Sequence, residues 1–208
     1  MHDIIVFLGP SLDLTAARAI LDAEYRPPAR RGDLLRAAEA GARTIVLIDG
    51  VFFQDCAVGH REVLAAIKRG TTVIGASSMG ALRAAELDTF GMIGIGEVYR
   101  LYRDGIVISD DEVALIYDPE TYLHLSEPLV NIRHNLDLAV KAGILTQDAA
   151  TAILARGQRM YFPDRTYVSV TAGSGESEEA FLSFVRKNGE DQKRLDAIEA
   201  LRTLTIQD

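Results

Sequence analysis

Three short apolar runs, each ending in a polar or glycine-containing turn, constrain the fold of this chain more than any other feature. They are Asp3–Leu8, Thr44–Ile48 and Thr72–Ile74. Because they are rich in β-branched residues and too short for typical helices, they predict buried strands. Helix-like segments of about ten residues separate them, and this alternation predicts parallel strands joined by right-handed crossovers. We therefore expect an α/β fold with a parallel sheet core.

The chain beyond residue 120 is predicted to be helical. Apolar residues recur at helical spacing after Glu127, and Thr146 begins a second such segment in the position of an N-cap. Two further helical stretches follow, around 178–187 and 191–204. We expect an α/β core in residues 1–120 and a helical subdomain packed on it in residues 121–208.

Composition narrows the class of protein. A formal net charge of −8 argues against nucleic-acid binding, because phosphate contacts need clustered Lys and Arg. No apolar run approaches the roughly 20 residues of a membrane span, and the N-terminal segment lacks the basic start of a signal peptide. A single cysteine, Cys56, fits a reducing compartment. We expect a cytoplasmic protein that binds neither nucleic acid nor membranes.

The third apolar run leads into a serine pair at a strand-to-helix turn, in the stretch TTVIGASSMGALRAAEL. Centred on Ser78, the pattern Ala76-x-Ser78-x-Gly80 is related to the nucleophile elbow, which exposes a serine hydroxyl above the end of a sheet. The alternative is structural: a serine caps the helix and Gly80 eases a tight turn. The local sequence leaves both interpretations open.

The carboxyl ends of the predicted strands carry three polar or flexible turns, which begin at Gly9, Asp49 and Ser77. In a parallel sheet these ends meet at one edge, where ligands bind in open α/β folds. We therefore expect Gly9, Asp49 and Ser77 to contribute to substrate binding beside a nucleophilic Ser78.

A serine nucleophile needs a proton acceptor and a group that stabilises the oxyanion. The helix before the third strand is expected to begin near the same edge, and its first turn carries His60 and Arg61. His60 is the candidate base, with packing against loop residues as the alternative, while Arg61 can hold a carboxylate or oxyanion. Arg83 and Glu86, three residues apart on the following helix, either pair with each other or face the ligand.

Two other motifs carry little chemistry by themselves. Three acids, Asp110–Glu112, lie between the strand-like runs Ile106–Ser109 and Val113–Tyr117. A solvated turn or partner-facing patch explains them better than a metal site, because no second motif of metal-ligand spacing accompanies them. The pair Gly94-x-Gly96 lacks the third glycine of a dinucleotide fingerprint. We expect no metal and no cofactor.

Several unusual motifs occur together in the order DGVFF, GHREVLAAIKRG, VIGASSMGALRAAEL, FGMIGIGEVYRLYRDG and DDEVA. In this combination the chain resembles the TfuA-like family over roughly Ile4 to Val140. The resemblance implies a partner of YcaO-type enzymes in peptide backbone thioamidation. It also implies hydrolysis of the C-terminal thiocarboxylate of a ubiquitin-like sulfur carrier, which releases sulfide for the YcaO enzyme.

The resemblance also implies roles for particular residues. The family site is described as a Ser-Lys pair, whose serine matches Ser78, and Arg61 stands where the family commonly has lysine in His-Lys-Glu. Ser78 would attack the thioacid carbonyl, Arg61 would bind the anionic thiocarboxylate, and His60 or a water would take the proton. The alternative is a non-catalytic adaptor that docks carrier and substrate to YcaO through surfaces such as Asp110–Glu112. Homo-oligomer formation through the helical tail stays open.

Overall fold

The computed structural model describes residues 3–52 and 56–205. Two compact units form, one from Met1–Ile108 with Lys193–Asp208 and the other from Ser109–Gln192. The sequence-based division at residue 120 differs from this grouping, because the last helix belongs with the first unit. Within the described residues, no helix combines the length and apolar character needed to cross a membrane.

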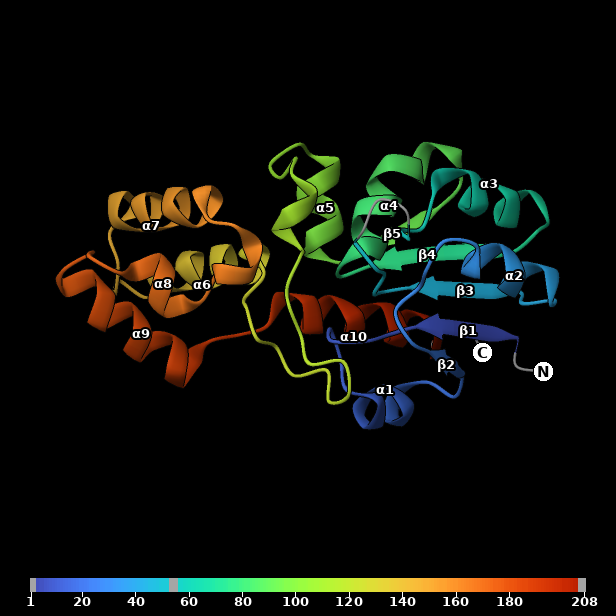
Figure 1. The fold of residues 1–208 in the computed structure, drawn as a ribbon, viewed down its shortest axis with the longest axis horizontal. Coiled ribbons are helices and arrows are strands. Elements are labelled where there is room, and N and C mark those ends of the chain that lie inside the picture. Colours follow the sequence, from blue (N-terminus) through green and yellow to red (C-terminus); the bar gives the residue numbers. More distant parts are fainter. Residues whose placement is uncertain (1–2, 53–55, 206–208) are drawn as a thin grey trace. The chain divides into compact units, whose positions relative to one another are not determined.

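A five-stranded parallel sheet forms the centre of the first unit (Figure 1). Its strands are β1 (Ile4–Phe7), β2 (Glu24–Arg26), β3 (Thr44–Leu47), β4 (Thr72–Ala76) and β5 (Ile93–Ile95). Their order across the sheet is β2-β1-β3-β4-β5, the order of flavodoxin-like doubly wound folds. The predicted α/β fold with a parallel core is confirmed.

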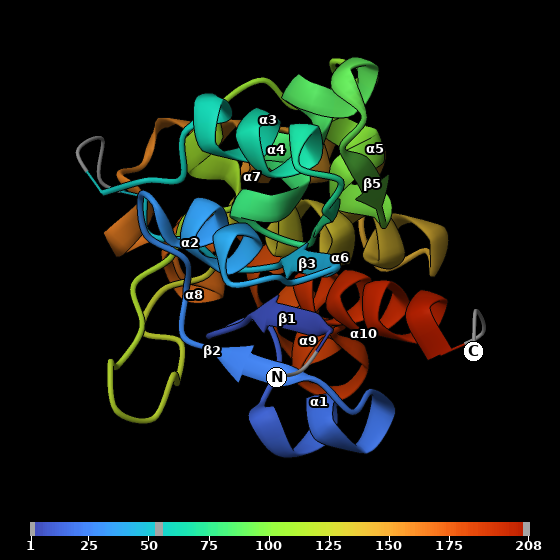
Figure 2. The same ribbon diagram turned by 90° about the vertical axis from the view of Figure 1, so that its right-hand side faces the viewer.

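Helices cover both faces of this sheet (Figure 2). They are α1 (Leu14–Ile20), α2 (Asp33–Glu39), α3 (His60–Lys68), α4 (Met79–Leu87), α5 (Glu97–Arg103) and α10 (Gln192–Thr205), with a 3₁₀ turn, η1, at Asp88–Phe90. Residues of α2, α3 and α4 share one apolar cluster with the strands, and residues of α1 and α10 share the other. Because the three inner strands β1, β3 and β4 are buried on both sides, their sequences are almost continuously apolar rather than alternating.

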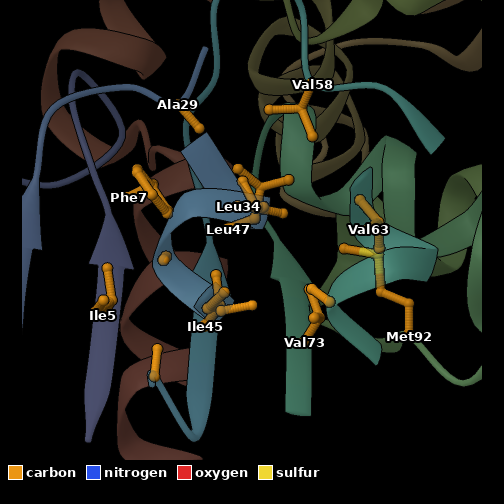
Figure 3. Close-up of a cluster of buried hydrophobic side chains, with 14 of the residues drawn as sticks. Ile5, Phe7, Ala29, Leu34, Ile45, Leu47, Val58, Val63, Val73 and Met92 are labelled. Atoms are coloured by element: carbon orange, nitrogen blue, oxygen red, sulfur yellow. The ribbon is translucent and has the colours of Figure 1, made fainter. Parts of the chain in front are cut away.

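Side-chain alternation along the strands separates the two clusters. Ile5, Phe7 and Leu47 face the cluster that contains Leu34 of α2 and Val63 of α3 (Figure 3). The intervening strand residues face α1 and α10 instead: Val6, Val46, Ile48, Ile74 and Ala76. This second cluster reaches the carboxyl ends of β1, β3 and β4, where functional residues are expected.

The second unit is helical and has its own apolar core. Its helices are α6 (Leu129–Lys141), α7 (Gln147–Arg159), α8 (Tyr167–Thr171) and α9 (Glu176–Asn188), with 3₁₀ turns η2 (Asp110–Glu112) and η3 (Phe162–Asp164). Its core is built from Leu129, Ile132, Leu136, Ala139, Ile153, Val170 and Phe181. The predicted N-cap is confirmed, since the Thr146 side chain accepts the N–H of Ala149.

Two strand predictions are wrong. Neither Ile106–Ser109 nor Val113–Tyr117 belongs to a sheet in the described chain, and a single isolated bridge joins Tyr117 to His124. A strand needs a neighbour for its N–H and C=O groups. Here Ile108 is 89% exposed, so this run has no sheet face to pack against.

Candidate active site at the strand ends

Asp49 joins the turns after β1 and β3. Its buried carboxylate accepts the N–H of Gly9 at 2.8 Å, the N–H of Ser11 at 3.1 Å and the Ser11 hydroxyl at 2.7 Å. Three donors occupy most of the roughly four acceptor positions of a carboxylate. The structure thus brings Gly9 and Asp49 together as the sequence predicted, but they bind each other; a role in substrate binding stays a prediction. The motif that starts at Asp49 ends at Phe53, which lies outside the described residues.

The turn from β4 into α4 is unusually tight. A Cβ atom on Gly80 would lie 1.7 Å from the carbonyl oxygen of Leu47, and one on Gly75 would lie 2.1 Å from the carbonyl oxygen of Gly80. Only glycine therefore fits at either position. Between them Ser77 has a φ of 68°, in the left-handed region that non-glycine residues seldom adopt. Strain of this kind is retained where the surroundings enforce it, often at active sites.

Neither serine hydroxyl at this turn is used in the way that helix capping predicts. Ser78 is the N-cap residue of α4, but its side chain makes no capping hydrogen bond. The Ser77 hydroxyl is completely buried and has no hydrogen-bond partner in the described chain. A buried hydroxyl without a partner costs about 1–3 kcal/mol, so its retention at a strained position points to function.

The N–H groups at the start of α4 are already largely used. Ser78 donates to the carbonyl oxygen of Ala76 at 2.7 Å, Gly80 donates to that of Ile48 at 3.2 Å, and Ala81 donates to that of Ser78 at 3.0 Å. Three of the four N–H groups from Ser78 to Ala81 thus have acceptors. A substrate anion at this turn needs other positive groups.

His60 lies away from the serines. Its Nε2 is 2.7 Å from a carboxylate oxygen of Glu86, which also pairs with Arg83 at 2.5 Å. Glu86 is eight residues beyond Ser78, which is about 12 Å along α4 at 1.5 Å per residue. The helix that carries His60 therefore begins beside the far end of α4. The structure does not bring this imidazole to the turn from β4 into α4, which we call the elbow.

Arg61 and Arg83 are likewise placed outside the turn. Arg61 is exposed on α3. Arg83 donates from Nε to the carbonyl oxygen of Val58 at 2.8 Å in addition to its bond with Glu86. The predicted pairing of Arg83 with Glu86 is present, so both side chains are engaged in holding α4 against the segment before α3.

Sequence reasoning missed two buried charged residues on α10. Lys193 and Asp196 are each 1% exposed. The Asp196 carboxylate accepts the N–H groups of Glu97 at 2.9 Å and Val98 at 2.8 Å, and so caps α5. A Cβ on Gly96 would lie 2.4 Å from Asp196 Cγ, which explains the glycine there.

The spacing of these residues is a signal that could have revealed them. Buried positions of α10 recur three and four residues apart, which defines one helix face. They are Gln192, Lys193, Asp196, Ala197, Ala200, Leu201 and Leu204. A lysine and an aspartate in the apolar stripe of a helix mark charges that the fold buries.

The three acids Asp110–Glu112 belong to the second unit, and only Glu112 is buried. Arg165, fully buried, donates to the carboxylate and the carbonyl oxygen of Asp111. Arg133 donates to Glu112 at 2.7 Å. Two of the three acids are thus paired with arginines of the same unit; a docking role for this segment stays a prediction. In the described residues no group of three His, Cys, Asp or Glu is arranged to hold a metal ion.

A sequence model described as TfuA-like protein matches residues 49–166, more than half of the chain. The matched region contains Asp49, the Ser77–Ser78 turn and much of the helical unit. It ends before α10, so Lys193 lies outside it. No protein with a curated description matches the chain.

Proposed function

The chain belongs to the TfuA-like family, and from this premise we propose that it hydrolyses the C-terminal thiocarboxylate of a ubiquitin-like sulfur carrier. Family membership supports a role in the YcaO-associated thioamidation system. In the proposed reaction, the released sulfide is the sulfur that a YcaO-type enzyme places on an activated peptide amide. We expect the reaction to take place in the cytoplasm.

The observation that carries the proposal is the strained turn at Ser77. Read from Gly75, the sequence Gly75-Ala76-Ser77 has the glycine-x-serine start of a nucleophile elbow, and the strained φ falls on its serine. The related pattern Ala76-x-Ser78-x-Gly80 is centred one residue later, on Ser78. The conformation and the unpartnered hydroxyl favour Ser77 as nucleophile, with Ser78 as its neighbour.

The proposed reaction has two steps. The Ser77 Oγ attacks the thiocarboxylate carbon, an Oγ–C bond forms, the C–S bond breaks, and the hydroxyl proton leaves with sulfide as HS⁻. Water then attacks the acyl ester, which restores the serine and releases the carrier as a carboxylate with one proton. Because Ser77 is fully buried, the groups that cover it have to move when the carrier tail enters.

The test is sulfide release from a thiocarboxylated carrier by Ser77→Ala and Ser78→Ala. These neighbouring serines are both buried, so each variant controls for the loss of a small hydroxyl. We expect Ser77→Ala to lose at least about 100-fold in rate and Ser78→Ala to stay within about tenfold of the wild-type protein.

The two variants also separate the alternatives. The reverse pattern would assign the nucleophile to Ser78. Full activity in both would remove the hydrolase proposal, and support of thioamidation by both variants would then favour a non-catalytic adaptor between carrier and YcaO enzyme.

A further inference from the structure

Lys193 is exceptional among the cations of the first unit. Within its described residues, 3–52, 56–108 and 193–205, it is the only lysine or arginine that is buried. Lysine is rarely buried without an electrostatic reason, because removing an ammonium group from water is costly. The position of this charge relative to the elbow therefore matters.

Strand register places α10 at the level of the elbow. Ala76 of β4 pairs with Ile95 of β5, so Ser77 and Gly96 follow at the same level of the sheet. Asp196 contacts the chain at Gly96, where its Cγ lies 2.4 Å from the position of a Cβ. Thus α10 passes the ends of the strands close to Asp196.

Lys193 lies beyond these strand ends. In Figure 1 α10 begins on the side to which the strand arrows point and runs back along the sheet. Lys193 precedes Asp196 by three residues, about 4.5 Å along the axis at 1.5 Å per residue. It shares a helix face with Ala197, which packs in the same cluster as Ala76. The lysine therefore lies on the part of α10 next to the edge at which β4 ends and Ser77 follows.

This edge needs a positive group if an anionic substrate is to bind there. The carboxylate of Asp49 is negative, and most N–H groups at the start of α4 already have acceptors. Arg61, the cation that the sequence analysis assigned to the substrate, is exposed on α3, whose start lies at the far end of α4. An ammonium group carries three donors, so Lys193 can hold an anion in addition to a protein partner.

We propose that Lys193 binds the anionic thiocarboxylate of the substrate and thereby selects acyl groups that carry a negative charge. This rests on the proposed hydrolase function. Lys193 takes the role that the sequence analysis gave to Arg61, and it acts from a helix that the family match does not include.

The experiment compares two substrates: a short peptide with a C-terminal thiocarboxylate and the same peptide as its neutral ethyl thioester. We expect Lys193→Met to raise KM for the thiocarboxylate at least tenfold, because a charged hydrogen bond is lost, and to change kcat/KM for the thioester less than about threefold. Arg194→Met, which removes the neighbouring exposed charge, controls for net charge. Far-UV circular dichroism and thermal unfolding establish that each variant is folded.

A second readout does not need turnover. In a Ser77→Ala background, calorimetry should detect binding of the carboxylate form of the peptide, and adding Lys193→Met should weaken it at least tenfold. If Lys193→Met lowers kcat equally for both substrates, Lys193 acts in proton transfer and the proposal is overturned. The proposal is also overturned if Lys193→Met leaves both the KM for the thiocarboxylate and the calorimetric affinity unchanged. If the wild-type protein releases no sulfide but the calorimetric difference is present, the hydrolase function fails while the anion site stands.

Discussion

Replacing Gly80 by alanine tests whether the elbow is as tight as the structure shows. The added Cβ would lie 1.7 Å from the Leu47 carbonyl oxygen, whereas ordinary contact begins near 3.4 Å, so α4 and β3 would have to separate by about 1.7 Å. The obstructing atom is backbone, so no side-chain rotation relieves the clash. Separation would also break the hydrogen bond from the Gly80 N–H to the Ile48 carbonyl oxygen.

The magnitude follows from three contributions. Overpacking of this kind costs about 1–3 kcal/mol, and the lost hydrogen bond costs about 1 kcal/mol. Alanine returns about 1 kcal/mol through its higher helix propensity. We expect the free energy of unfolding to fall by about 1–3 kcal/mol, which in a chain of this length lowers Tm by roughly 2–12 °C.

The measurement is urea unfolding followed by circular dichroism and tyrosine fluorescence, since the chain has no tryptophan. Gly59→Ala is the matched control, because Gly59 also lies at a helix start, has a φ of −93° and has no atom within 4 Å of a Cβ position. Gly59→Ala should change the free energy of unfolding by less than about 1 kcal/mol. If Gly80→Ala costs no more than this control, the close approach of α4 to β3 is refuted.

Three further predictions follow from other parts of the first unit. Asp49→Asn should destabilise the protein by about 2 kcal/mol in urea unfolding, because an amide cannot accept the three hydrogen bonds that the loop after β1 donates; an unchanged midpoint would contradict this. Tyr25 donates its hydroxyl hydrogen to the carbonyl oxygens of Ala17 and Leu21, and burial raises its pKa from 10.0 to about 12. Because its pKa is raised, Tyr25 contributes stability that is fully present below pH 10 and is lost as the pH rises to about 12. The free energy of unfolding of Tyr25→Phe should therefore fall less over this pH range than that of the wild-type protein. Parallel pH dependences of the two proteins would exclude this role for Tyr25. His60→Ala should retain sulfide release within about threefold, because the imidazole is held at the far end of α4; a loss of 100-fold would restore His60 as the base.

The fold was predictable where burial on both faces of the sheet dictates composition. The runs that became β1, β3 and β4 are continuously apolar, and no other element accommodates such short segments. β2 (Glu24–Arg26) was missed because it is a short, polar edge strand. β5 was missed because Gly94 interrupts it, and that glycine is required by the Tyr99 ring, 2.2 Å from where a Cβ would lie. This requirement for glycine comes from tertiary packing, so no local sequence pattern indicates that the segment is a strand.

The sequence was enough to predict that the candidate site lies at the carboxyl edge of the sheet, at the turn that follows β4. Parallel strands necessarily bring their carboxyl ends together, so Asp49 and the serine pair were placed correctly on one edge. The proton acceptor was not predictable in this way. No local sequence pattern fixes where a helix begins relative to residues distant in the chain, and α3 begins beside Glu86 rather than beside Ser77.

The contribution of α10 follows from the order of the chain. After the helical unit, the chain returns to the first unit at Lys193, and its final helix runs back along the sheet. The same helix face that buries Ala197 and Leu201 therefore also places Asp196 at the start of α5 and Lys193 over the strand ends. Folding of the core and completion of the charged site thus depend on one amphipathic stripe. A chain truncated before residue 192 would lose the cap of α5 and the α10 side of the second core cluster. It would also lose Lys193, the only buried cation among the described residues of the first unit. The turn from β4 into α4 therefore does not make a complete anion site without α10.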